Sequence, residues 1–201
     1  MDYLIYDLET YRIPWDGKSE KKEGLKYANS WLDYEGLGIS VVACYSSVDG
    51  KFHSFDDSDL DQFIDLARSH KHGEIIGFNS KRFDDLILEA AGYRLKTTYD
   101  LLLECWRANG LDPDYDFPEG DEENRKKYAG YKLDVLAIAN FGKGKTGHGA
   151  LAPALWQKGE HEKVIRYCLE DVRLTHELLL LGWKGELWHP GTRKFLQLRP
   201  L

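Results

Sequence analysis

Apolar residues in the first part of the chain fall into short runs separated by turn residues, which is typical of β-strands. The turn Asp49-Gly50 separates two of these runs and favours a tight hairpin between them. The pattern therefore predicts an opening strand followed by a hairpin and a further strand. The four runs, rich in Leu, Ile, Val and Tyr, cover residues 2–8, 38–46, 51–55 and 74–78.

Between and after these runs, apolar positions recur three and four residues apart, which indicates amphipathic helices. Asp57 or Ser58 would cap the first helix, and Gly92 and Gly142 would end two of the others. Strands interleaved with helices imply an α/β fold with a mixed β-sheet flanked by α-helices. The helical patterns cover residues 60–67, 82–91, 99–108, 131–140 and 160–181.

The 201 residues, of which 42% are hydrophobic, are enough for one domain with a substantial core. We expect residues 1–182 to form this domain. Residues 11–36 would be a long, insertion-like loop and residues 110–124 an acidic loop. Residues 183–201 would be an irregular tail that packs on the domain through its tryptophans and could also contact a partner protein.

The cellular setting follows from what the chain lacks. No apolar run approaches the roughly 20 residues needed to cross a bilayer, and the start lacks the features of a signal peptide. Cys44, Cys105 and Cys168 are widely spaced and form no metal-ligand pattern, so we expect them to be reduced and structural. A cytoplasmic protein without a membrane partner is the expectation.

Acidic residues in three short motifs carry the candidate chemistry. Asp7 and Glu9 are two residues apart on a predicted strand, so their side chains point to the same face. Asp84 opens a helix directly after a strand, and Tyr167 and Asp171 lie one helical turn apart. Carboxylates gathered from distant segments are a usual way to hold two divalent cations around a phosphodiester.

These three motifs resemble those of the DEDD superfamily of 3′–5′ exonucleases. Tyr167 in the third motif makes the chain similar to the subtype (DEDDy) shared by many polymerase proofreading domains. The resemblance spans residues 3 to about 180. It implies a ribonuclease H-like sheet and two divalent ions, Mg²⁺ or Mn²⁺. The implied reaction removes nucleoside 5′-monophosphates from a single-stranded 3′ end of DNA or RNA.

The resemblance also implies a role for each acidic position. Asp7 would bridge both ions, with Glu9 and Asp171 completing the tightly held site. Asp84 would hold the second ion through water, and Tyr167 would orient the attacking water.

The residues around the acidic motifs would contact the substrate. Leu8 and Thr10 would border the terminal nucleotide, with Phe83 supporting the loop that Asn79 begins. Asp85 directly follows Asp84, so either could be the third carboxylate, although the Phe-Asp pairing favours Asp84.

The net charge of −7 argues against tight, non-specific binding to nucleic acid, because phosphate contacts need clustered Lys and Arg. Ions bound to carboxylates offset part of that charge, so we expect a footprint of a few nucleotides at a strand end. Basic residues cluster at Lys18, Lys21 and Lys22, at Lys81 and Arg82, at Arg125, Lys126 and Lys127, and at Lys143 and Lys145.

Two other motifs occur in the sequence, and two other functions fit the same fold. Residues 112–123 have the carboxylate spacing of a calcium loop, but Phe117 stands where its sharp turn needs glycine. Gly144-Lys145-Thr146 resembles the end of a phosphate-binding loop without its first glycine, and His148 or His161 could contact substrate. The same fold would also serve a ribonuclease H-like endonuclease or resolvase, or a non-catalytic nucleic-acid-binding module.

Overall fold

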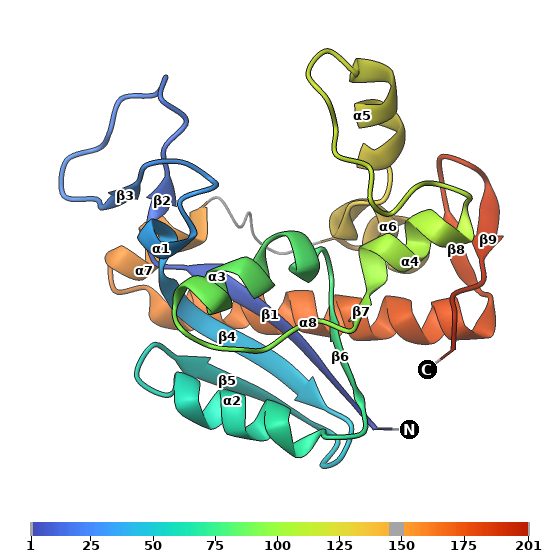
Figure 1. The fold of residues 1–201 in the computed structure, drawn as a ribbon, viewed down its shortest axis with the longest axis horizontal. Helices are drawn as coiled ribbons and strands as arrows, with labels where there is room; N and C mark the ends of the chain where they lie inside the picture. Colours follow the sequence, from blue (N-terminus) through green and yellow to red (C-terminus); the bar gives the residue numbers. More distant parts are fainter. Residues whose placement is uncertain (1, 145–150, 201) are drawn as a thin grey trace.

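The computed structural model describes residues 2–144 and 151–200, and its centre is a five-stranded sheet (Figure 1). The strand order is β5-β4-β1-β6-β7. Because β1 pairs antiparallel with β4 and parallel with β6, the sheet is mixed, as predicted. The predicted hairpin is confirmed in β4 and β5. The strands are β1 (Tyr3–Thr10), β4 (Ile39–Ser46), β5 (Lys51–Asp56), β6 (Glu74–Gly77) and β7 (Tyr99–Asp100).

Helices cover both faces of this sheet, so the predicted fold class is confirmed. Helices α2 (Leu60–Ser69) and α3 (Asp84–Ala90) pack on one face. The long helix α8 (His161–Lys184) crosses the other face and runs along most of the molecule (Figure 1). No helix in the described part of the chain has both the length and the apolar character needed to span a membrane.

The alternation of side chains along β1 divides the core in two. Leu4, Tyr6 and Leu8 point toward α2 and α3, whereas Tyr3 and Ile5 point toward α8. Both sets are buried, so the central strand is covered on both faces. Asp7 and Glu9 follow Tyr3 and Ile5 at alternate positions of β1, so they face α8 as well.

Of the smaller elements, two-stranded pairings form within residues 11–36 and within the C-terminal tail. The helices are α1 (Tyr34–Leu37), the short 3₁₀ helix η1 (Ser80–Arg82), α4 (Leu101–Ala108), α5 (Glu122–Ala129), α6 (Leu133–Phe141) and α7 (Ala152–Gln157). The short strands are β2 (Ile13–Pro14), β3 (Tyr27–Ala28), β8 (Leu187–His189) and β9 (Lys194–Leu196). In Figure 1, α1, α7, β2 and β3 lie toward one side of the molecule, and α4, α5, α6, β8 and β9 lie toward the other.

Several local predictions were wrong. Helix α5 was missed because its exposed sequence has almost no apolar face, although Asp121 caps it by accepting a hydrogen bond from the Asn124 N–H. The N-cap of α2 is Asp59, because Ser58 instead forms a tight turn with Asp56. The tail is no irregular segment but a hairpin, in which Leu187 and Leu196 are buried against the core.

The hairpin is held by a buried histidine whose neutral form is fully hydrogen-bonded. The His189 ring stacks on Tyr131 at 4.0 Å between centroids. Its Nε2 donates to the Gly130 carbonyl at 3.2 Å, and its Nδ1 accepts from the Thr192 N–H at 3.1 Å. Burial lowers the pKa of His189, since the charged ring is costly to desolvate.

We therefore expect the contribution of His189 to stability to be lost in acid. A folded-state pKa below the unfolded value of about 6.5 means that this stability is complete above that pH and declines as the pH falls through it. The urea midpoints of wild type and His189→Gln should differ most near pH 7.5 and converge toward pH 5.5. A gap that stays constant with pH would contradict the assignment.

Candidate active site

Three carboxylates meet where α8 crosses β1. One ligand atom from each of Asp7, Glu9 and Asp171 lies within 4.8 Å of the others, and this is the one such group of three or more among the described residues. Glu9 and Asp171 are buried, with 8% and 7% of their surfaces exposed, and Asp7 is partly exposed. The strand alternation that turns Ile5 toward α8 places Asp7 and Glu9 on the same side.

The local electrostatics around these carboxylates are strongly negative. Cys168 lies on α8 one turn before Asp171, and its Sγ is 3.3 Å from the Asp7 carbonyl oxygen. Burial, and then the charges of Asp7, Glu9 and Asp171, raise the pKa of Cys168 well above its ordinary value, so its thiol stays protonated and donates. A site with this charge and these oxygen donors suits a hard divalent cation such as Mg²⁺ or Mn²⁺.

The neighbouring residues Asp84 and Asp85 have different surroundings. The Asp85 carboxylate accepts hydrogen bonds from the Tyr6 hydroxyl at 2.5 Å and from the Thr97 N–H and hydroxyl at 3.0 and 2.8 Å. All three residues are buried, so Asp85 joins β1, α3 and the segment before β7. These contacts give Asp85 a structural role and leave Asp84 as the candidate third acidic position.

Asp84 opens α3 and is 4% exposed, but it lies outside the group formed by the other three carboxylates. Its charge is nonetheless close to β1. Burial first, and then the charges of Asp84 and Asp85, raise the pKa of Tyr6 well above its ordinary value. Of the four predicted acidic residues, Asp7, Glu9 and Asp171 lie together. Asp84 comes from α3, which packs on the face of the sheet opposite α8.

A tight turn between β6 and α3 positions this fourth carboxylate. Asn79 adopts a left-handed backbone with φ of 67°, and Asp100 accepts hydrogen bonds from the N–H groups of Asn79 and Lys81 at 2.9 and 3.1 Å. A Cβ on Gly77 would lie 2.0 Å from the Ser80 hydroxyl oxygen, so glycine is required there. Sequence analysis missed Asp100, because the predicted helix of residues 99–108 included it, whereas Asp100 ends β7 and caps α4, which begins at Leu101.

Tyr167 lies on α8 one turn before Asp171 and is partly exposed. The same helical face therefore carries the phenol and the carboxylate, as the spacing predicted.

A small pocket of about 150 Å³ adjoins the acidic group through Glu9. It brings together Leu8, Thr10 and Phe83, which come from two distant motifs. Trp31 completes one wall, with its ring centroid 6.0 Å from that of Phe83 and half of its surface exposed. Sequence analysis missed Trp31, because residues 11–36 carry no pattern that places a side chain beside β1.

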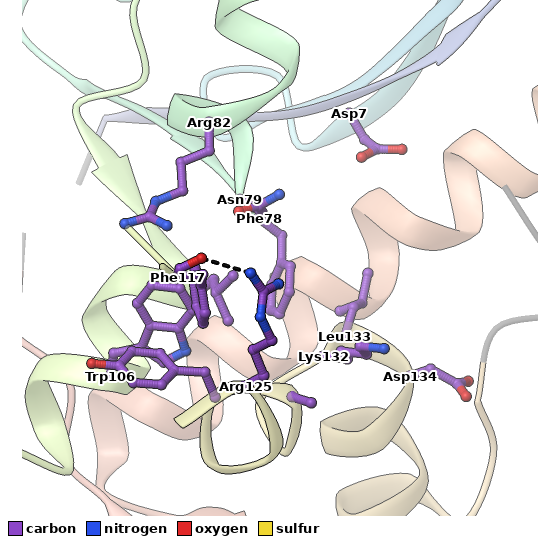
Figure 2. A pocket seen from close by; sticks show the side chains of 13 residues that line it. Asp7, Phe78, Asn79, Arg82, Trp106, Phe117, Arg125, Lys132, Leu133 and Asp134 are labelled. Atoms are coloured by element: carbon purple, nitrogen blue, oxygen red, sulfur yellow. Dashed lines mark hydrogen bonds between the residues drawn. The ribbon is translucent and has the colours of Figure 1, made fainter. Parts of the chain in front are cut away.

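A larger pocket of about 680 Å³, which we call the basic pocket, has Asp7 at its edge (Figure 2). Asn79 lines it, so the four predicted substrate contacts divide between the two pockets. Its other walls come from the turn after β6, from η1, from α4, from α5 and the segment before it, and from the start of α6. They include Phe78, Arg82, Leu102, Trp106, Phe117, Arg125, Tyr128, Ala129, Lys132, Leu133 and Asp134.

The calcium-loop motif gains no support from the structure. No cluster of three potential metal ligands occurs in residues 112–123, all of which are described. Phe117, at the position where a calcium loop needs glycine, nonetheless adopts a left-handed backbone, with φ of 53°. His161 stacks on Trp156 at 4.1 Å between centroids, whereas Lys145, Thr146 and His148 lie outside the described residues.

Comparison with known proteins identifies structural neighbours but no family. No model of a known protein family matches the chain, and no curated protein matches it by sequence. A family B DNA polymerase from the hyperthermophilic archaeon Pyrobaculum calidifontis matches in structure with a TM-score of 0.54 and 18% identity. The match covers 90% of this chain and 24% of the polymerase.

A second structure, described as an ExoI/SSB-Ct complex, matches with a TM-score of 0.35 and 17% identity over 89% of this chain and 43% of that one. This chain thus spans about a quarter and less than half of the two proteins. At such identities the polymerase match establishes the fold alone. The chain has a mixed α/β fold of the ribonuclease H-like type, with three carboxylates gathered beside its central strand.

Proposed function

We propose that the chain is a metal-dependent 3′–5′ exonuclease of the DEDDy type, which releases nucleoside 5′-monophosphates from DNA or RNA. The observation that carries the proposal is the convergence of Asp7, Glu9 and Asp171, two of them buried, at the edge of an open pocket. Three neighbouring negative charges are costly without a cation, and carboxylates are the ligands that Mg²⁺ and Mn²⁺ prefer. The fold shared with part of a DNA polymerase agrees with the motif resemblance.

Each carboxylate then has a position-specific task. Asp7, Glu9 and Asp171 would hold the first ion, with Asp7 shared with a second ion that Asp84 would support through water. When bound, the two ions would lower the pKa of the attacking water and neutralise charge on the leaving oxygen. The protein contributes the fixed spacing of the carboxylates, which comes from strand β1 and helix α8.

The small pocket would hold the terminal nucleotide. Leu8, Thr10 and Phe83 border a space next to Glu9 that is lined mainly by apolar side chains. Trp31 offers an aromatic face beside Phe83, and aromatic rings bind bases by stacking without selecting the sequence. The 3′-terminal base would therefore stack here while its phosphate lies at the carboxylates.

We expect Tyr167→Phe to lower kcat about 10- to 100-fold, since misplacing a reacting water costs up to this much. The task that the motif resemblance implies for the phenol is to orient the water by a hydrogen bond. KM and calorimetric metal affinity should change little. Tyr93→Phe, which removes the same atom outside the site, is the control, and an unchanged kcat for Tyr167→Phe would remove the residue from the mechanism.

The proposed function is tested by digesting matched single-stranded DNA and RNA, labelled at either the 3′ or the 5′ end, with Mg²⁺ or Mn²⁺. Digestion with EDTA and by Asp7→Ala provides the controls. The expected result is a 5′-labelled ladder that shortens from the 3′ end, absent in both controls. Cleavage of closed circular strands would favour an endonuclease, and no degradation of any substrate would contradict the proposal.

A further inference from the structure

Three cations line the basic pocket from separate elements. Arg82 comes from η1, Arg125 from α5 and Lys132 from the residue that precedes α6. Figure 2 shows Arg82 and Arg125 extending toward each other across the pocket, with Asp7 at its edge. The pocket lining holds these three cations together with two carboxylates, Asp7 and Asp134.

Aromatic rings line the same part of the pocket as these cations, with Trp106 and Tyr128 buried and Phe117 partly exposed. Trp106 and Tyr128 meet edge to face at 4.6 Å between centroids, and Phe117 lies 6.0 Å from Trp106. The Arg82 guanidinium carbon lies 5.1 Å from the centre of the Trp106 ring. Aromatic faces next to Arg and Lys are the combination by which proteins bind single-stranded nucleic acid, because bases stack on the rings while cations meet the phosphates.

The segment before α5 is held over the pocket by the same arginines. Arg82 Nη2 donates to the carbonyls of Pro113 and Tyr115 at 2.8 and 2.9 Å, and Arg125 Nη2 donates to that of Phe117 at 2.6 Å. Each of these guanidinium groups has further N–H donors, whereas Lys132 forms no hydrogen bond through its side chain with the described residues. These hydrogen bonds fix the wall of the pocket, and its cations have further N–H donors that can bind an anion.

We propose that the basic pocket binds the single-stranded nucleotides next to the terminal one, with their phosphates at Arg125 and Lys132 and their bases against Phe117, which is more exposed than the other two rings. This inference rests on the proposed function. Because Asp7 lies at the edge of the pocket, a strand whose terminal phosphate is at the carboxylates continues directly into it. The cavity volume of about 680 Å³ is within the range of pockets that enclose ligands of nucleotide size.

The test compares two substrates, a single-stranded oligonucleotide and the p-nitrophenyl ester of thymidine 5′-monophosphate, which is too short to reach the basic pocket. The variants are Lys132→Ala and the double variant with Arg125→Ala. For the double variant, kcat/KM on the oligonucleotide should fall at least tenfold more than on the ester. Because the double variant removes both cations that would meet phosphates, the salt dependence of oligonucleotide binding should also weaken, by about 1.4 in the log–log slope.

The matched control is the double variant Lys126→Ala with Lys127→Ala, which removes the same charge from α5 at positions that do not line the pocket. It should behave as wild type. The loss of Arg125 can disturb the segment before α5, because Arg125 donates to the Phe117 carbonyl. The single variant Lys132→Ala leaves that hydrogen bond in place, so the same two-substrate comparison is made with it. Equal losses on both substrates, or an unchanged salt slope, would overturn the inference.

Binding measured by fluorescence anisotropy in EDTA separates this inference from the proposed function. If wild type hydrolyses neither substrate, the proposed function fails, yet weaker oligonucleotide binding by Lys132→Ala would still support the pocket assignment. Free thymidine 5′-monophosphate is the second ligand in this assay. If the variants weaken its binding as much as that of the oligonucleotide, the pocket is a mononucleotide site and the strand assignment is wrong.

Discussion

Asp85→Ala is expected to lower the free energy of unfolding by about 3–5 kcal/mol, because it leaves two buried residues without their acceptor. The Tyr6 hydroxyl and the Thr97 N–H and hydroxyl all donate to this carboxylate, and both residues are at most 4% exposed. Each orphaned buried donor costs about 1–3 kcal/mol. Urea unfolding followed by circular dichroism measures the loss.

A double-mutant cycle separates this network from a general packing defect. Tyr6→Phe removes one of the donors, so the combination of Tyr6→Phe and Asp85→Ala should cost less than the sum of the two single changes. Strict additivity would contradict the hydrogen-bonded arrangement.

The neighbouring substitution Asp84→Asn should have the reverse profile. The side chain is nearly the same size, so we expect a small change in stability together with a large fall in kcat. The assignments would be reversed if Asp85→Asn were stable but inactive and Asp84→Asn kept full activity. Asp85 would then be the catalytic residue and Asp84 the structural one.

Asp7→Asn is expected to lower kcat at least about 10³-fold, equivalent to roughly 4 kcal/mol of transition-state stabilisation. Asp7 is both a member of the carboxylate group and the residue that reaches the basic pocket, so no neighbour can replace it. Kinetics with Mg²⁺ and with Mn²⁺ measure the effect. Asp57→Asn, at an exposed turn before α2, is the matched control and should retain full activity.

Metal removal provides an independent readout of the same site. An ion that binds only the folded state raises its Tm, so adding Mg²⁺ or Mn²⁺ after chelation should stabilise the wild type. Asp7→Asn should lose most of this shift, while its Tm in EDTA should be equal to or above that of the wild type, because removing one of three neighbouring negative charges relieves repulsion. If the ions raised the Tm of both proteins equally, the metal would be bound elsewhere.

The pattern of apolar residues was enough to predict the sheet and its main helices, because buried strands and amphipathic helices record their burial in local spacing. It also placed Asp7 with Glu9, and Tyr167 with Asp171, since those pairs share one strand and one helix. By contrast, α5 carries no apolar face, and the short tail strands gain their stability from packing against the core, so neither has a local signal.

Local spacing by itself therefore determined the fold class of this protein and the faces on which its acidic residues lie. Only the tertiary structure decided that Asp171 meets Asp7 and Glu9, that Asp85 is tied to Tyr6 and Thr97, and that two pockets adjoin the group. The physical reason is that periodicity records which face of an element is buried. It carries no information on which distant face that element packs against, and the pockets arise from those contacts.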